Sequence, residues 1–172
     1  MIEIKEITNP NEKQEIFAYI LNQLNYSDAK ELANPIDPLP FWGVFDRGNA
    51  VGFLAMKEHD EIWGELFAIG ILEDYQRISI GRGLFNLMQN YAMAKGLGYL
   101  FVRLNTISNP ENKGIFKFLH SMGFVDFEAM GIEAPPALLE YTENLSFIMM
   151  KDLKNYNNSY KCKTPEELNE QR

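Results

Sequence analysis

The chain has 172 residues, of which 46% are hydrophobic and 13% aromatic, so it can bury one substantial core. It carries 24 acidic against 16 basic residues, a formal net charge of −8. This excess of acid argues against nucleic-acid binding, which requires a basic face. One cysteine and two histidines exclude a disulfide framework and a Cys/His zinc site. The N-terminus lacks an apolar signal segment and no stretch approaches the length of a membrane span, so we expect a soluble, cytoplasmic protein without metal.

The first half of the chain changes from strand to helix periodicity and back. Apolar residues recur at every second position near the N-terminus and then at helical spacing from Ile16 to Leu24. A polar turn at residues 46–49 separates two strand-like runs and predicts a hairpin. The predicted elements are a strand over 2–7, a helix after Pro10, hairpin strands over 41–45 and 50–56, and a long apolar strand over 62–72 that follows a turn at 58–61.

In the second half, two amphipathic helices alternate with strands. Each helix is followed by glycine, which is a frequent C-terminal residue of helices. The predicted elements are a helix over 84–91 that ends near Gly96, a strand over 99–104, a helix over 115–122, strands over 124–130 and 145–150, a helical turn at 138–141 and a short helix from Pro165. The sum is a mixed α/β (α+β) domain of about seven strands and about four helices. We assign it to residues 1–151 and predict a polar C-terminal tail over 152–172.

The turn between the long apolar strand and the following helix has the features of an anion site. It presents backbone N–H groups at a helix N-terminus, where the helix dipole favours negative charge. Small residues allow a diphosphate to approach the backbone, and two arginines add positive charge. The alternative is a glycine-assisted connection with two solvated arginines. The residues concerned are Arg77, Ser79, Gly81, Arg82 and Gly83.

Together with the helix that follows, this turn resembles the GNAT family of N-acetyltransferases. The family's loop pattern is Gln/Arg-x-x-Gly-x-Gly/Ala, and residues 76–81 (QRISIG) match it except that Ser79 replaces the first glycine. A later helix that ends in Gly123-Phe124 is similar to the family's closing helix, and the predicted order of elements is similar to its fold. The resemblance implies a central, mostly antiparallel sheet and an enzyme that transfers an acetyl or other acyl group from acetyl-CoA (CoA) to an amine.

The resemblance also implies which residues bind the cofactor. The loop amides would hold the pyrophosphate, and the edge of the preceding strand would pair with the pantetheine arm and direct an amide near Ile71 at the thioester carbonyl. Asn112 matches a family residue that contacts the cofactor near its pantetheine end; its alternative role is a helix cap. The implied cofactor-binding residues are Ile69, Ile71, Leu72, Arg77, Ile78, Ser79, Ile80, Gly81, Arg82 and Asn112.

Glu65 is the best candidate for a catalytic base. It is an isolated charge in the apolar strand, and a carboxylate there can take the proton that the amine must lose, directly or through water. Its distance from Gln76 also resembles that of the catalytic Glu in some family members. The alternative is an outward-facing Glu on a half-exposed strand. His59 and Glu61 are predicted to lie in or beside a turn and to be solvated.

Leu119 departs from the family pattern. Many members have a tyrosine here, which donates a proton to the leaving thiolate, and leucine cannot do so. His120 is adjacent in sequence but lies about 100° around the helix. Two hypotheses therefore stay open: an N-acyltransferase that works by direct attack of the amine, and a catalytically weak acyl-CoA-binding or sensing domain.

The acceptor is expected to be a small-molecule or peptide amine. Its recognition is assigned to the loop at residues 34–40 and the insert at residues 131–144, where Glu140 and Glu143 would suit a cationic acceptor. Dimerisation is common in the family's fold, so the resemblance is compatible with a homodimer.

Overall fold

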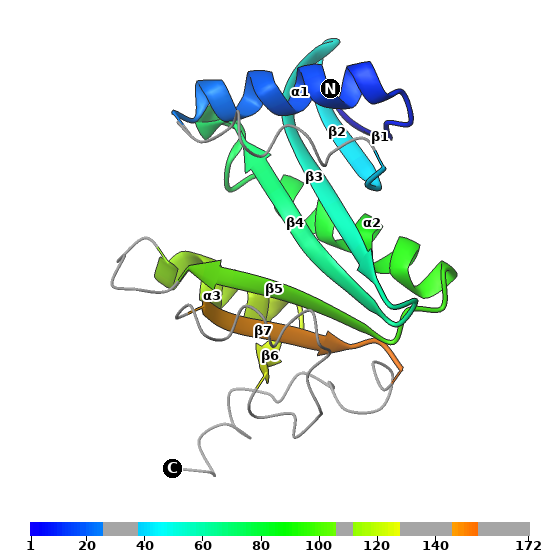
Figure 1. The fold of residues 1–172 in the computed structure, drawn as a ribbon. Coiled ribbons are helices and arrows are strands. Elements are labelled where there is room, and N and C mark those ends of the chain that lie inside the picture. Colours follow the sequence, from blue (N-terminus) through cyan, green and yellow to red (C-terminus); the bar gives the residue numbers. More distant parts are fainter. Residues whose placement is uncertain (26–37, 106–111, 128–145, 155–172) are drawn as a thin grey trace.

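The computed structural model describes residues 1–25, 38–105, 112–127 and 146–154. These residues form a seven-stranded sheet in the order β1-β2-β3-β4-β5-β7-β6 (Figure 1). Every pair of neighbouring strands is antiparallel except β4 with β5. The strands are β1 (Ile2–Glu6), β2 (Phe41–Asp46), β3 (Asn49–His59), β4 (Trp63–Ile71), β5 (Tyr99–Asn105), β6 (Val125–Asp126) and β7 (Ser146–Asp152). The helices are α1 (Pro10–Gln23), α2 (Ile80–Ala94) and α3 (Asn112–Ser121), with a 3-10 turn, η2 (Glu73–Tyr75), before α2.

The predicted fold class and order of elements are confirmed. Within the described residues there are three α-helices; the helical turn predicted at 138–141, the short helix from Pro165 and the insert at 131–144 lie outside them. Strand β3 continues to His59, so the turn predicted at 58–61 begins later, at Asp60. Of the strand predicted over 124–130, the described residues 124–127 contain β6 at Val125–Asp126, and residues 128–130 lie outside the described part of the chain.

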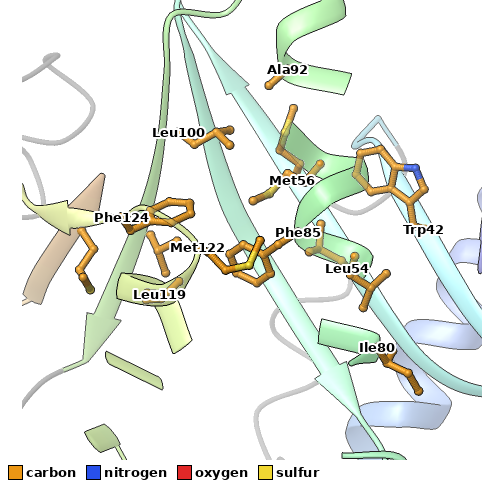
Figure 2. Close-up of a cluster of buried hydrophobic side chains, with 14 of the residues drawn as sticks. Trp42, Leu54, Met56, Ile80, Phe85, Ala92, Leu100, Leu119, Met122 and Phe124 are labelled. Atoms are coloured by element: carbon orange, nitrogen blue, oxygen red, sulfur yellow. The ribbon is translucent and has the colours of Figure 1, made fainter. Parts of the chain in front are cut away.

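Helices cover both faces of the sheet. Helix α1 lies on one face, where Phe17 and Ile20 pack against Phe41 and Phe53 of β2 and β3. Helices α2 and α3 lie on the other face. Figure 2 shows sheet residues Trp42, Leu54 and Met56 against α2, with Leu119 and Phe124 from the α3 segment beside them. Because the described helices divide between the two faces, the middle of the sheet is buried on both sides.

The sheet splits between its two central strands. Strands β4 and β5 pair only at their first three residues, from Trp63 with Tyr99 to Glu65 with Phe101. Beyond this point they diverge (Figure 1). The register of β3 with β4 also shifts between Ala55 and Met56, which leaves Phe67 as an extra residue in β4. A bulge bends its strand, and here it occurs just past the last β4–β5 pair.

Candidate active site

A cavity of about 680 Å³ lies where β4 and β5 diverge. It is bounded by the second half of β4, the turn before α2, the first turns of α2, the middle of β5 and one face of α3. Its lining joins apolar side chains to a few polar ones. The residues are Leu66, Phe67, Ala68, Ile69, Ile71, Gln76, Arg77, Ser79, Gly81, Arg82, Phe85, Val102, Arg103, Gly114, Ile115, Phe118 and Leu119.

Strand β4 turns backbone groups toward this cavity. The Leu72 N–H donates to Val51 O of β3 at 2.9 Å. Because alternate residues of a strand direct their N–H and C=O groups to the same side, the groups of Ile69 and Ile71 point away from β3, toward the gap. The side chain of Gln76 donates from Nε2 to Ile71 O at 2.9 Å and holds the end of this edge. An extended ligand arm in the cavity can therefore add to β4 as a strand would.

The turn before α2 has a left-handed backbone. Arg77 has φ +65° and Ser79 has φ +68°, and the first helical hydrogen bond runs from Gly83 N to Ser79 O at 3.1 Å. The N–H groups of the first turn of α2 have no partner within the helix. With Arg77 and Arg82 lining the same end of the cavity, this is an anion-binding arrangement.

The two glycines of this turn have different roles. A Cβ on Gly81 would stand 3.5 Å from the ring of Phe118, at the cavity wall. A Cβ on Gly83 would stand 3.3 Å from Ile4 Cδ1, so Gly83 allows α2 to approach β1. Gly83 was predicted to let a diphosphate approach the backbone. In the structure it instead allows α2 to pack closely against β1.

The structure separates the ten predicted cofactor residues. Leu72 uses its N–H in the β3–β4 ladder, Ile78 is 53% exposed, and Ile80, the first residue of α2, is 5% exposed in the core. Asn112 begins α3, and its cofactor role stays a prediction. The remaining six line the cavity: Ile69, Ile71, Arg77, Ser79, Gly81 and Arg82.

Glu65 is buried in a network of three side chains. Only 2% of it is exposed, which excludes the alternative of an outward-facing Glu. Its Oε1 accepts from Arg103 Nε at 2.5 Å and is also ion-paired with Arg103 Nη2. Its Oε2 lies 2.7 Å from His59 Nε2. Both carboxylate oxygens are therefore held by side chains of neighbouring strands.

The predicted solvation of His59 is wrong, whereas Glu61 is exposed as predicted. The side chain of His59 is 13% exposed because β3 extends to this residue and places the ring 5.6 Å from the ring of Phe101. Sequence reasoning also missed Arg103, which lines the cavity and binds Glu65. The sequence feature that could have indicated Arg103 is that it is a single cation inside an apolar strand.

Leu119 lies in the cavity wall. It is 1% exposed and packs in the same cluster as Phe85 and Met122 (Figure 2). The position at which many family members have a tyrosine thus faces the cavity and carries an aliphatic side chain.

Two further features concern the described part of the chain. It contains no group of three or more His, Cys, Asp or Glu side chains that could hold a metal ion. None of its helices is both long and apolar enough to cross a membrane.

A mixed sheet that splits at its centre, with an anion-binding turn at the edge of the split, is suited to an enzyme that binds a long ligand with an anionic end. The model of the acetyltransferase (GNAT) family matches residues 4–124. The chain therefore belongs to this family of enzymes, whose reaction is acyl transfer. A search of curated proteins finds no match.

Solved structures agree in fold. An acetyltransferase from Streptococcus agalactiae has a TM-score of 0.64 at 18% identity, over 88% of this chain and 98% of that one. The ribosomal-protein-S18-alanine N-acetyltransferase of Escherichia coli has a TM-score of 0.62 at 17% identity, over 89% of this chain and 94% of that one. A GNAT family acetyltransferase from Elizabethkingia anophelis with acetyl-CoA bound has a TM-score of 0.60 at 17% identity, over 88% of this chain and 97% of that one. These low identities show a shared fold.

Proposed function

We propose that this enzyme transfers an acetyl group from acetyl-CoA to an amine by direct attack of the amine. The observation that carries the proposal is the cavity itself. One end combines the N-terminus of α2 with Arg77 and Arg82, and its side is the open edge of β4. This arrangement suits a long ligand with an anionic end and an amide-containing arm, and CoA has both.

The residues present fit CoA as follows. The amides of the first turn of α2, with Arg77 and Arg82, would hold the pyrophosphate. The backbone of Ile69 and Ile71 would bind the pantetheine arm and direct an N–H at the reacting carbonyl oxygen, where negative charge develops. When bound, acetyl-CoA supplies an activated acetyl thioester.

Glu65 is the proposed base. An attacking amine must be neutral, because an ammonium nitrogen has no lone pair. As the neutral nitrogen bonds to the acetyl carbon it must lose a proton, and the bond from carbon to sulfur breaks to release the CoA thiolate, which takes a proton from solvent. The Glu65 carboxylate lies at the closed end of the split, behind Arg103 of the cavity wall. It would take this proton through an intervening water.

A binding experiment tests the cofactor part of the proposal. Titration calorimetry with acetyl-CoA should show binding to the wild type, and Arg82→Gln should raise the Kd about tenfold, because one charge-assisted contact to phosphate is lost. Arg47→Gln is the matched control, since it removes the same charge from an exposed turn between β2 and β3. Absence of heat at millimolar acetyl-CoA would refute the cofactor assignment, and equal effects of the two variants would refute the role of Arg82.

A thiol-release assay tests the reaction. With a panel of small amines and peptides, at least one acceptor should raise CoA release above hydrolysis. Glu65→Gln should lower kcat by about a hundredfold at neutral pH and less at high pH, where the free amine is more abundant. An unchanged rate over the whole pH range would remove Glu65 from the mechanism.

The second candidate function is an acyl-CoA-binding or sensing domain with little catalytic power. The observation that favours it is Leu119 in the cavity wall, which offers no proton to a leaving thiolate. Binding of acetyl-CoA without any acceptor that accelerates thiol release would support this function over the first.

A further inference from the structure

Three strands bring His59, Glu65 and Arg103 together at the closed end of the split. Glu65 is the last residue of β4 that pairs with β5, and Arg103 stands two residues beyond its partner Phe101. His59 is the last residue of β3 and pairs with Trp63, next to the pair of Glu58 with Gly64. Of the three, only Arg103 lines the cavity. The network therefore reaches from the cavity wall, through Glu65, to a histidine on the far side.

We propose that His59 is a positioning residue for Glu65, and that protonation of His59 switches off the activity of the site at low pH. The inference rests on the proposed function, because it needs Glu65 to act on the acceptor amine. His59 does not touch the cavity, so it acts through Glu65 alone.

The contacts of Glu65 give the reason for the switch. A carboxylate only accepts hydrogen bonds, so a neutral His59 donates its Nε2–H to Oε2 and fixes the carboxylate opposite Arg103. A protonated His59 adds a second cation to a carboxylate that is already paired with arginine. The extra positive charge stabilises the ionised carboxylate and makes it a poorer proton acceptor.

The charges that face His59 within the described residues come from all three strands. Glu65 on β4 and Arg103 on β5 are joined as above, and Lys57 on β3 stands opposite Glu65 in the register but is exposed. The ring itself lies against Phe101. Since Glu65 and Arg103 compensate each other, the charge on His59 decides the net charge of the network.

The chain offers a direct assay, because it contains two histidines. His120 is exposed on α3 and serves as an internal reference in an NMR titration of the imidazole signals. Glu65→Gln should change the titration of His59 and leave that of His120 unchanged. If neither histidine responds to Glu65→Gln, the pair is not formed in solution and the inference is wrong, whatever the activity of the enzyme.

Kinetics then separate positioning from packing. The acid limb of kcat/KM should have its midpoint at the pH at which the His59 signals change in the NMR experiment. His59→Gln keeps an N–H donor near Glu65 but cannot be charged, so it should move the acid limb to lower pH and lose no more than about threefold in kcat at pH 8. His59→Phe keeps the ring beside Phe101 without a donor, and should lower kcat at every pH by about tenfold or more.

The KM for acetyl-CoA should be the same in the wild type and both His59 variants, because His59 lies outside the cavity wall. His120→Gln is the control and should leave the pH profile unchanged. An acid limb that persists at the same pH in His59→Gln would overturn the inference. Failure of the wild type to release thiol with any amine would instead overturn the proposed function, and the NMR result would still decide whether Glu65 and His59 form a pair.

Discussion

The backbone conformation of Ser79 explains why the family's loop pattern has glycine at this position. Its φ of +68° lies in the left-handed region, which is costly for residues with a Cβ and free of strain for glycine. Ser79 also ends the turn without a side-chain cap on α2, so the hydroxyl brings no compensating bond there. The chain therefore keeps the backbone of the family's turn at a cost in strain.

Replacing this residue should reveal that cost. Ser79→Gly should raise the free energy of unfolding by up to about 1 kcal/mol, because relief of strain exceeds the extra freedom of glycine in the unfolded chain. Ser79→Val should lower it, since a β-branched residue fits this region worst. Urea unfolding measures both, and a stability of the valine variant equal to that of the glycine variant would show that the turn is not left-handed in solution.

Leu119 gives a second test at single-residue scale. Leu119→Tyr places a phenol at the cavity wall, where it can protonate a leaving thiolate, and Leu119→Phe adds the same ring without the hydroxyl. We expect the tyrosine variant to release thiol about tenfold faster than the phenylalanine variant, which is the low end of general-acid effects. Both variants should lose stability, by about 1–3 kcal/mol, because Leu119 is buried and belongs to the same core cluster as Phe85 and Met122, which a larger ring would disturb. Equal rates would show that no proton donor is needed there.

At the scale of elements, Lys151 ties β7 to the two helices that form the cavity wall. It is 2% exposed, and its Nζ donates to Gln89 Oε1 of α2 at 2.5 Å and to Met122 O just after α3 at 2.7 Å. Gly123 has φ +86°, and a Cβ there would approach Lys151 Cε at 3.3 Å. Burial lowers the pKa of Lys151 to about 8.

This lowered pKa predicts a rise of stability with pH. The unfolded chain keeps the Lys151 proton up to a pKa near 10.5, whereas the folded chain releases it above about 8. Between these values the unfolded state binds more protons, so the free energy of unfolding should increase, by roughly 1.5 kcal/mol from pH 8 to pH 9.5. Lys151→Met should lack this increase, and the exposed Lys117→Met should keep it. Parallel curves for the wild type and Lys151→Met would contradict the assignment.

At the scale of the whole molecule, the split divides the sheet into β1–β4 and β5-β7-β6. Three pairs of residues join β4 to β5, and the ion pair of Glu65 with Arg103 lies at the point where the pairing ends. The molecule carries a net charge of −8, so the proposed anionic cofactor would have to be held by local groups such as Arg77 and Arg82 against a repulsive field. Arg103 also lines the cavity, but its charge is compensated by Glu65, so Arg77 and Arg82 are the arginines of the lining that are left to offset the field.

Removing Arg103 should weaken the junction of the two halves. Arg103→Met leaves the buried Glu65 with His59 alone, and a broken buried pair costs about 3–5 kcal/mol. The double variant Glu65→Gln/Arg103→Met should recover much of this loss, because it removes the uncompensated charge. Urea unfolding with Arg47→Met as an exposed control measures these effects. A loss below about 1 kcal/mol for Arg103→Met would mean that the pair contributes little to the junction.

The local features of this protein could be predicted from its sequence. Apolar periodicity predicted the strands and helices, since each element must bury one face. The turn from Gln76 to Gly83 was predicted because helix N-termini, small residues and arginines act over a few neighbouring positions. Glu65 stood out because it is an isolated charge inside an apolar strand, where a carboxylate can act as a base.

The partners of Glu65 were decided by tertiary structure alone. His59 lies six residues away in sequence and Arg103 lies 38 away, and only the parallel pairing of β4 with β5 brings all three strands together. The same holds for the cavity, which exists because the pairing stops at Glu65 and β4 bends at Phe67. Register and strand divergence depend on packing across the whole sheet, so the sequence determined the parts of the site and the tertiary structure decided how they meet.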